Sequence, residues 1–257
     1  MIRLAITGKG GVGKTTVAVF LAKYLAEQGR QVVLIDADPD ANTAMTLGLD
    51  ASEQPEPVSE MKELIAERTG AKGSGGEFFS LNPQVDDIPG RFAVDAGGIK
   101  LLRMGRLAKG GSGCFCPENA FLKNLLAHLF FAGQADVVLD MEAGVEHLGR
   151  GTAQGVDRML VVVEPGQRSI QTARIIKRYA ADVGIENVGV VINKFRSEDQ
   201  LRTVQEQLSD LEVVGRFPYS EAVAAADLEG SCPYTGSEEQ RQAVHRLLDA
   251  VAQDAPA

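Results

Sequence analysis

Residues 8–15 of the chain read GKGGVGKT, and this segment decides the fold prediction. It fits the pattern G-x-x-x-x-G-K-[ST], a glycine-rich loop that wraps around phosphate groups. The segment follows a short apolar run at 2–7 and precedes a helical pattern at 14–28. This order of strand, loop and helix is the context that such a loop requires. The stretch therefore predicts a phosphate-binding loop between a strand and a helix.

Each residue type in the loop has a physical role. Glycines let the backbone curl so that its N–H groups point at phosphate oxygens, and the N-terminus of the following helix adds partial positive charge. Lys14 is expected to reach the β- and γ-phosphates, and the Thr15 hydroxyl to bind Mg²⁺. The residues expected to contact the nucleotide here are Gly8, Lys9, Gly10, Gly11, Val12, Gly13, Lys14, Thr15 and Thr16.

The same loop also fits a second pattern, G-x-G-x-x-G, with Asp36 at about the distance a dinucleotide-binding fold requires. The pair Lys14-Thr15 decides against that alternative, because a dinucleotide turn has no use for a cation and a hydroxyl at those positions. The segment DVVLD (136–140), an apolar strand that ends in an aspartate, also favours the triphosphate interpretation.

Short apolar runs alternate with longer helical patterns along the chain. Strands are expected at 2–7, 31–36, 99–104, 136–140, 158–164, 187–193 and 212–217. Helices are expected at 14–28, 117–132, 167–183, 198–209 and 238–252. Several strands are apolar without alternation, which is typical of parallel strands covered on both faces. The sequence therefore predicts an α/β fold with a doubly wound, mostly parallel sheet flanked by helices.

Residues 50–90 interrupt this alternation. A short helix is possible within 58–70, and 70–90 is loop-like. The strand pattern resumes afterwards and needs the first strands to complete the sheet. We therefore expect one domain over 1–257 with an insertion at about 50–90.

Composition excludes several classes of protein. The formal net charge of −9 over 257 residues argues against a dedicated nucleic-acid binder, which usually carries a basic face. No apolar run reaches the length of about 18 residues that suggests a membrane span. The N-terminus, MIRLAITGKGG, reaches the glycine loop after one short apolar run, so no signal peptide is expected. We expect a cytoplasmic protein with reduced cysteines and no membrane or nucleic-acid partner.

Lys9 extends the loop motif. KGGVGKTT resembles the deviant Walker A motif of the dimeric ATPase class that includes MinD, ParA, nitrogenase iron protein and the arsenite and tail-anchor ATPases. The resemblance implies a MinD/ParA-like P-loop fold, ATP hydrolysis and a homodimer in which Lys9 reaches the partner's nucleotide. It also implies that Asp38 positions the attacking water, and that Asp36 and Asp140 hold Mg²⁺ with Thr15. Asp40 is expected to face solvent, and Asn42 to lie nearer the metal.

The base is expected to be adenine. The segment NKFR (193–196) begins like the guanine-binding motif N-K-x-D, but Arg196 replaces the aspartate that pairs with guanine. By resemblance to the same class, Asn193 would contact adenine and Pro218 would flank it. A strand-end capping role for Asn193 remains the alternative.

Two cysteines, Cys114 and Cys116, are separated by one residue in GCFCPEN. Pro117 is a favourable first helical residue, which places Cys116 at the helix N-cap, where its thiolate forms more readily. Two thiolates leave most metals under-coordinated, but two copies across a dimer supply four sulfurs, which suit Zn²⁺ or Ni²⁺. A pair of packed thiols and a redox pair are the alternatives, and Cys232 is expected to be structural.

Four segments together resemble the CooC-type ATPases that mature carbon monoxide dehydrogenase by nickel insertion: GKGGVGKTT, DADPDAN, GCFCPEN and DMEAGVEHLGRGTA. The resemblance implies slow ATP hydrolysis coupled to metal transfer and the apo-dehydrogenase as client. A maturation ATPase for acetyl-CoA synthase is an alternative. An electron-transfer ATPase or a MinD/ParA-like positioning ATPase is more distant.

Overall fold

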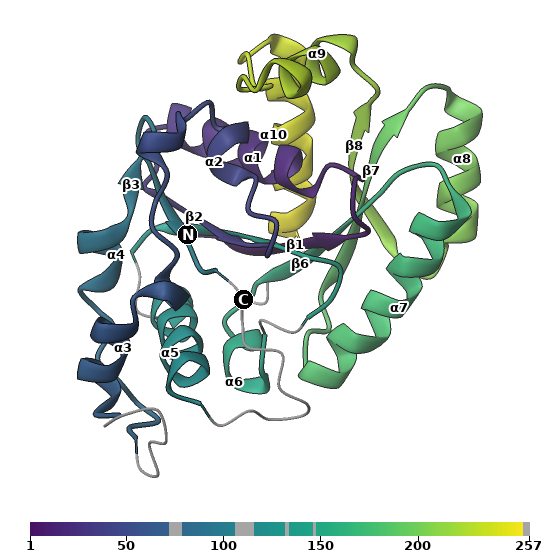
Figure 1. The fold of residues 1–257 in the computed structure, drawn as a ribbon. Helices are drawn as coiled ribbons and strands as arrows, with labels where there is room; N and C mark the ends of the chain where they lie inside the picture. The colour runs from purple at the N-terminus through teal and green to yellow at the C-terminus, as the bar shows by residue number, and fades with distance from the viewer. Residues whose placement is uncertain (72–78, 106–115, 132–133, 146–147, 254–257) are drawn as a thin grey trace.

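A mostly parallel sheet of eight strands runs through the centre of the molecule (Figure 1). The computed structural model describes residues 1–71, 79–105, 116–131, 134–145 and 148–253. The strands are β1 (Arg3–Gly8), β2 (Val32–Ala37), β3 (Val94–Asp95), β4 (Ile99–Arg103), β5 (Asp136–Met141), β6 (Arg158–Val163), β7 (Val188–Phe195) and β8 (Glu212–Pro218). Their order is β3-β4-β2-β5-β1-β6-β7-β8, and only the short edge pair β3–β4 is antiparallel. Strands β2 to β5 lie on one side of β1, and β6 to β8 lie on the other. In open α/β sheets, ligands bind at the carboxyl ends of the strands, at such a switch point.

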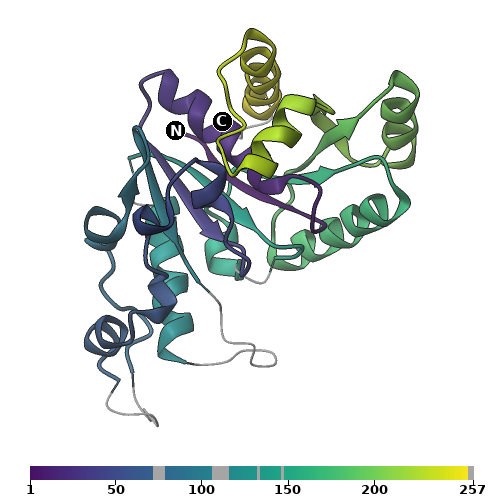
Figure 2. The same cartoon turned by 45° about the horizontal axis from the view of Figure 1, so that its top comes forward.

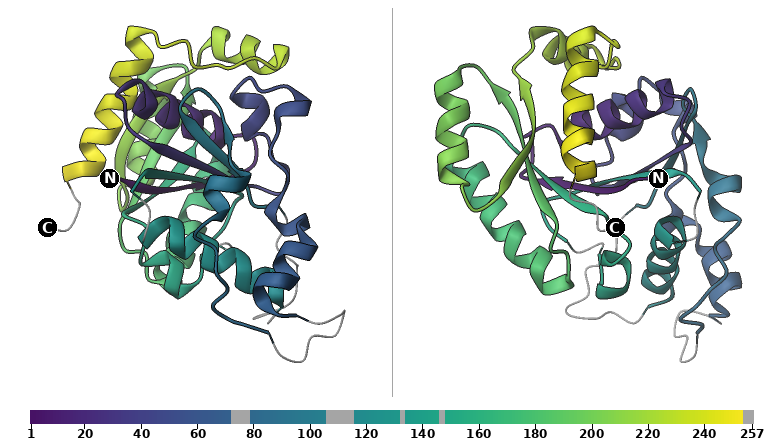
Figure 3. Two further views of the ribbon diagram at one scale, coloured as in Figure 1. Left: turned by 90° about the vertical axis from the view of Figure 1, so that its left-hand side faces the viewer. Right: turned by 180° about the vertical axis from the view of Figure 1, so that it is seen from behind.

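Helices cover both faces of the sheet. They are α1 (Lys14–Glu27), α2 (Thr43–Thr46), α3 (Lys62–Thr69), α4 (Ile88–Phe92), α5 (Pro117–Phe131), α6 (Arg150–Ala153), α7 (Gln167–Val183), α8 (Glu198–Gln207), α9 (Glu221–Glu229) and α10 (Glu238–Gln253), with two single 3₁₀ turns at Ala51–Glu53 and Val58–Glu60. One hydrophobic core joins the sheet to α1 and α10, and a second joins its other face to α5, α7 and α8. Figure 3 shows the two layers from the side and from behind. None of the helices in the described ranges is both long and apolar enough to cross a lipid bilayer.

The α/β fold class is confirmed, and the seven expected strands and five expected helices are present with bounds that differ by at most two residues. Every residue of β2, β5 and β6 is buried, which explains why these strands are apolar without alternation. The sequence did not reveal β3, α2, α4, α6 and α9. Four of these have two to five residues, too few for a periodic pattern, and α9 has no buried residue to create one.

The segment 50–90 packs against the helix that follows the C-x-C motif. Ile65 and Ile88 are buried in the same core as Phe121 and Leu125 of α5. The side-chain amide of Asn124 in α5 donates a hydrogen bond of 2.7 Å to the carbonyl of Leu81. Figure 2 shows α3 beside α5. We propose that this segment and the sheet unfold as one domain.

Ile65→Ala tests this proposal. The side chain is 2% exposed, so the cavity should lower the free energy of unfolding by about 2–5 kcal/mol. The whole transition should shift in a denaturant titration followed by circular dichroism. Leu81→Ala is the control, because its side chain is 58% exposed and its loss should change stability by less than about 0.5 kcal/mol. A separate early transition for the Ile65 variant would contradict the single domain.

Candidate nucleotide site

The loop between β1 and α1 has a shape that only glycine permits at two positions. A side chain at Gly8 (φ 150°) would place its Cβ 2.4 Å from the carbonyl oxygen of Val162 in β6. A side chain at Gly13 (φ 93°) would place its Cβ 2.3 Å from the side-chain nitrogen of Asn193. Gly11 also has a left-handed backbone, with φ 83°. The loop therefore packs closely against β6 and β7, and α1 begins directly after it, at Lys14.

Two side chains from the end of β7 hold this loop. The Asn193 amide donates a hydrogen bond of 2.8 Å to the carbonyl of Val12, and the Lys194 ammonium donates one of 2.7 Å to the carbonyl of Gly11. Both bonds are accepted by loop carbonyls and use none of the loop's N–H groups, which are the donors that an anion needs. The predicted adenine contact thus also supports the phosphate loop.

Two aspartates lie next to each other under the loop. Asp36 of β2 and Asp140 of β5 are register partners in adjacent parallel strands, and both are buried. Thr43 joins them: its N–H donates to Asp36 Oδ2 at 3.1 Å, and its hydroxyl donates to Asp140 Oδ2 at 3.3 Å. The Thr15 hydroxyl also contacts Asp140. The structure therefore brings together Thr15, Asp36 and Asp140, the three residues expected to hold Mg²⁺.

This environment changes the acidity of both carboxyl groups. Burial, together with the negative charge of Asp36, raises the pKa of Asp140 to about 7, against the opposing effects of Thr15 and Lys14. Burial likewise raises the pKa of Asp36. Placing two carboxylates together in a buried site is unfavourable unless a cation lies between or beside them.

The residues fit a magnesium ion. Asp140 Oδ1 is buried and has no hydrogen-bond partner among the residues that the structure describes, so one oxygen of the pair is left for a cation. No group of three or more His, Cys, Asp or Glu side chains within the described residues is arranged to hold a metal. Mg²⁺ suits such a sparse site, because it keeps several waters and binds through one or two carboxylates and substrate phosphates.

Lys14 and Asp38 form an ion pair in this structure, which holds no nucleotide. The Lys14 ammonium lies 3.4 Å from Asp38 Oδ2, and both side chains are largely buried. Because Lys14 is also the cation expected to meet phosphate, a bound triphosphate would compete with Asp38 for it. This arrangement places Asp38 at the phosphate end of the loop, as its expected role with the attacking water requires.

The residues predicted to contact the base lie at the ends of β7 and β8. Asn193 is 7% exposed, and Pro218 ends β8 beside Phe195, two residues further along β7. Arg196 stacks on the ring of Tyr219, with its guanidinium carbon 3.5 Å from the ring centroid. Arg196, which replaces the guanine-binding aspartate, thus makes a cation–π contact with an aromatic side chain.

The remaining candidate residues are Lys9, Asp40, Asn42 and the two cysteines of the C-x-C motif. Lys9 is half-buried in the loop, and Asp40 is exposed, as expected. Asn42 is also exposed, and the residue that contacts the acidic pair is its neighbour Thr43. Cys116 directly precedes α5, and its carbonyl accepts the Ala120 N–H at 3.1 Å, as an N-cap residue does. Cys114 lies outside the described residues.

Sequence reasoning missed two threonines. Thr43 bridges the acidic pair, and Thr7 holds the start of the segment after β5 through its hydroxyl, which donates to the carbonyl of Glu142 at 2.7 Å. The N–H of Gly144 donates back to the same hydroxyl at 3.2 Å. Nothing in the local sequence marks either threonine, since Thr43 reaches Asp140 across 97 positions and Thr7 reaches Glu142 across 135.

Asp140→Asn tests the acidic pair in protein free of nucleotide and magnesium. The Asp140 carboxyl group is protonated up to about pH 7 in the folded chain, but it ionises above its ordinary pKa of 3.8 in the unfolded chain. Wild-type stability should therefore fall relative to the Asn variant as pH rises from about 4 to 7, by up to about 4 kcal/mol. Urea unfolding in EDTA at pH 5 and pH 8 should show about 2–3 kcal/mol of this difference, because part of it is already lost at pH 5.

Asp136→Asn in the same strand is the control. It loses an ion pair with Arg30 at 2.5 Å, so it should be less stable than wild type at both pH values. A stability difference between wild type and Asp140→Asn that does not change with pH would contradict the raised pKa.

Comparison with known proteins agrees with this geometry. The family model described as the CobQ/CobB/MinD/ParA nucleotide binding domain matches residues 4–234. The carbon monoxide dehydrogenase accessory protein CooC of Rhodospirillum rubrum is 44% identical over 252 residues, which cover 97% of this chain and 96% of that protein.

Solved structures share the fold at lower identity. A chain of the MinC:MinD cell division protein complex from Aquifex aeolicus has a TM-score of 0.71 and 20% identity, over 100% of this chain and 98% of that one. The septum site-determining protein MinD complexed with Mg-ADP from Pyrococcus horikoshii has a TM-score of 0.65 and 19% identity, over 99% and 96%. The chain therefore belongs to the CobQ/CobB/MinD/ParA nucleotide-binding family and is a CooC-like ATPase within it.

Proposed function

We propose that this protein is an ATP-dependent metallochaperone that inserts nickel during the maturation of carbon monoxide dehydrogenase. The similarity to CooC over nearly the whole chain carries the proposal. The C-x-C segment at Cys114 and Cys116 supports it, because two thiolates one residue apart are suited to carrying a metal. ATP would be hydrolysed to ADP and phosphate slowly, in step with metal transfer, in the cytoplasm.

The nucleotide site would act through charge. The loop N–H groups and Lys14 would bind the phosphates, and Thr15, Asp36 and Asp140 would hold Mg²⁺, which would supply positive charge to offset that of the phosphates. Asp38, released from Lys14 by the incoming phosphates, then orients the attacking water. Thr43 keeps the two metal-binding carboxylates in register.

Lys9 would complete the site of a second protomer. It occupies the phosphate loop and is only half-buried, so part of the residue lies at the surface of the protomer. In a homodimer closed around ATP, the Lys9 ammonium would stabilise the charge that develops on the partner's phosphates, as an arginine finger does. ATP would thereby favour the closed dimer.

The metal cargo would bind at the same dimer. Cys116 stands at the N-cap of α5, where the helix dipole favours its thiolate. Two C-x-C segments brought together across the dimer would supply four sulfurs, a set that accepts Ni²⁺ or Zn²⁺. Each protomer alone would supply half a site.

Contacts at both ends of the C-x-C region would couple it to the nucleotide. Before it, the Met104 N–H at the end of β4 donates to the Asp36 carbonyl at 2.8 Å. After it, α5 packs against α6, and a Cβ at Gly155, two residues beyond α6, would lie 2.6 Å from Phe130 Cβ. The segment leading to α6 begins at Gly144, which Thr7 holds beside the phosphate loop. ATP and metal would then favour the same state and promote each other's binding.

Replacing the two thiols tests the metal-transfer function. Cys114→Ser/Cys116→Ser should reduce bound nickel or zinc from about one ion per dimer to none, because a hydroxyl is a poor ligand for these ions. The variant should also fail to activate nickel-free carbon monoxide dehydrogenase supplied with Ni²⁺ and ATP. Elemental analysis and carbon monoxide oxidation are the two measurements.

Cys232→Ser is the matched control. Cys232 is partly buried near Gly48 and packs against the core that joins α1 to the sheet, so its replacement should leave metal content unchanged. Unchanged metal content in the double variant would contradict the C-x-C assignment. Activation of acetyl-CoA synthase, and not of the dehydrogenase, would identify the other client.

Lys9→Ala tests the trans-acting cation. ATP should still bind through Lys14, but the turnover number should fall by about 10³-fold, the lower end of what a trans-acting arginine contributes. ATP should also no longer promote the dimer in light-scattering measurements. Lys100→Ala, an exposed lysine on β4, is the control and should behave as wild type. Full ATPase activity from a monomeric Lys9 variant would exclude the trans role.

A further inference from the structure

Thr7 stands in β1 directly before Gly8, the first glycine of the phosphate loop, and its side chain is fully buried. Its hydroxyl donates to the carbonyl of Glu142 at 2.7 Å and accepts the N–H of Gly144 at 3.2 Å. The Gly144 carbonyl lies 3.2 Å from the same hydroxyl oxygen. One side chain thus joins the strand that carries the loop to the segment that follows β5. None of the phosphate, magnesium or base contacts proposed above uses this hydroxyl.

These contacts lie where β5 separates from β1. The pairing of β1 with β5 ends at Ile6 and Asp140, whereas its pairing with β6 continues to Gly8 and Val162. The chain after β5 therefore leaves β1 while β1 is still part of the sheet. The Thr7 hydroxyl supplies a donor and an acceptor at this point, in place of main-chain groups. Because a buried main-chain group without a partner is unfavourable, the hydroxyl fixes the position at which the segment begins.

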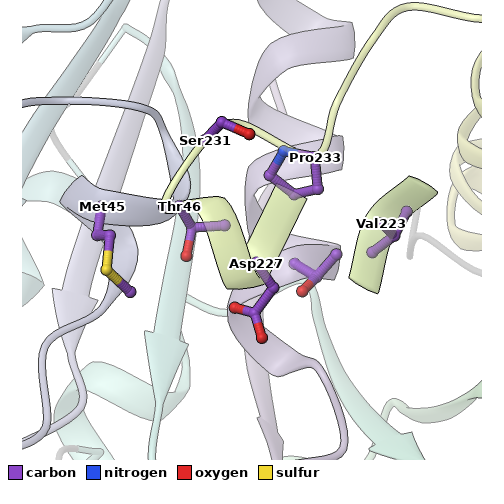
Figure 4. A pocket seen from close by; sticks show the side chains of 8 residues that line it. Met45, Thr46, Val223, Asp227, Ser231 and Pro233 are labelled. Atoms are coloured by element: carbon purple, nitrogen blue, oxygen red, sulfur yellow. The ribbon is translucent and has the colours of Figure 1, made fainter. Parts of the chain in front are cut away.

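The side chain of Thr7 and the phosphate loop belong to opposite faces of the sheet. Ile6 packs in the core with α1, and Ala5 in the core with α5, so alternation along the strand puts Thr7 on the α5 face. Val12 of the loop packs in the α1 core. Figure 4 shows that side of the sheet, where residues of α1, α2 and α9 line a small pocket, Thr46 among them. Thr7 therefore connects the loop on one face with the segment on the other.

The segment that Thr7 holds is packed against α5. Val145 and Leu148 are buried in the same core as the apolar side chains of α5. The Arg3 guanidinium donates to the carbonyl of Phe130 at 3.0 Å and holds the C-terminal end of that helix. Closely packed cores have two discrete arrangements more readily than intermediate ones. A shift of the segment would therefore be passed to the N-terminal end of α5, the end next to the C-x-C motif.

We propose that the Thr7 hydroxyl is the positioning group that transmits nucleotide binding in the phosphate loop to α6 and to the N-terminal end of α5. It touches neither nucleotide nor metal and acts through the main chain of Glu142 and Gly144. Phosphates bound by the loop shift the strand end that carries Thr7, and the hydroxyl carries this shift to the opposite face of the sheet. The inference rests on the proposed ATP-dependent function and names the group that links its two sites.

Hydrogen–deuterium exchange of the full chain, with and without Mg²⁺ and the non-hydrolysable analogue AMPPNP, tests the proposal. In wild type, AMPPNP should slow exchange in α6 and in the first turn of α5 by about tenfold, within the usual range of coupling between sites. In Thr7→Val, exchange in both elements should be the same with and without AMPPNP, although α1 is still protected. Thr7→Ser retains the hydroxyl and should restore the response. A merely structural role would speed exchange in both states and leave the response intact.

Two other threonines provide matched controls. The Thr69 side chain is 2% exposed, and its hydroxyl donates to the carbonyl of Ile65 at 2.6 Å, so Thr69→Val also removes a buried hydroxyl. The Thr46 hydroxyl donates to the carbonyl of Asn42 at 2.9 Å, on the loop's side of the sheet. Both valine variants should keep the response of α6 and α5 to AMPPNP. Circular dichroism checks folding, and Thr7→Ala replaces Thr7→Val if the valine variant is unfolded.

Zinc binding separates this inference from the proposed function. AMPPNP should tighten Zn²⁺ binding to wild type by about tenfold and leave the dissociation constant of Thr7→Val unchanged. An undiminished exchange response in Thr7→Val, or a wild type in which AMPPNP protects α1 but neither α6 nor α5, would overturn the role of Thr7. A wild type that shows the exchange response but no change in Zn²⁺ affinity would contradict the proposed metal transfer and leave the Thr7 link intact.

Discussion

The pairing of β2 with β5 is the constraint on which the site depends. Their register places Asp36 beside Asp140 at the carboxyl edge of the sheet, directly under the phosphate loop. Burial and mutual repulsion make this pair unfavourable without a cation, as the raised pKa of Asp140 indicates. Two apolar cores on the faces of the sheet stabilise the strands that hold the pair together. The fold thus provides the stability that the site itself lacks.

The same carboxyl edge explains how distant segments can respond to one nucleotide. Asp36 bonds through its backbone to Met104 at the end of β4, and Thr7 bonds to the segment after β5. The first segment leads to α5, the helix that begins next to Cys116, and the second leads to α6, which packs against α5. Parallel strands end at one edge, so the loops after them meet there whatever their distance in sequence. A chain that couples ATP to a metal needs such a meeting point.

Strands and long helices were predictable because their buried apolar residues form regular patterns along the chain. Fully buried parallel strands such as β5 and β6 read as continuous apolar runs, and α7 has a clear apolar stripe. The elements that escaped prediction are short or lack a buried face, and α9 combines alanines with exposed acidic residues. In the insertion at 50–90 the sequence indicated only a short helix within 58–70, which is present as α3, and did not show that Ile65 and Ile88 complete the core over α5. Their burial depends on a partner that the local sequence does not contain.

The sequence by itself determined the phosphate loop, the order of the strands along the chain and the candidate residues Lys14, Asp36 and Asp140. These follow from local spacing, because a loop and the helix after it are built from consecutive residues. Only the tertiary structure decided which distant groups meet. It placed Thr43 between the two aspartates, Asn193 against the loop carbonyl of Val12, and the Thr7 hydroxyl against Gly144. Such contacts join strands and helices whose adjacency arises from packing, and packing is not encoded in any single stretch of the chain.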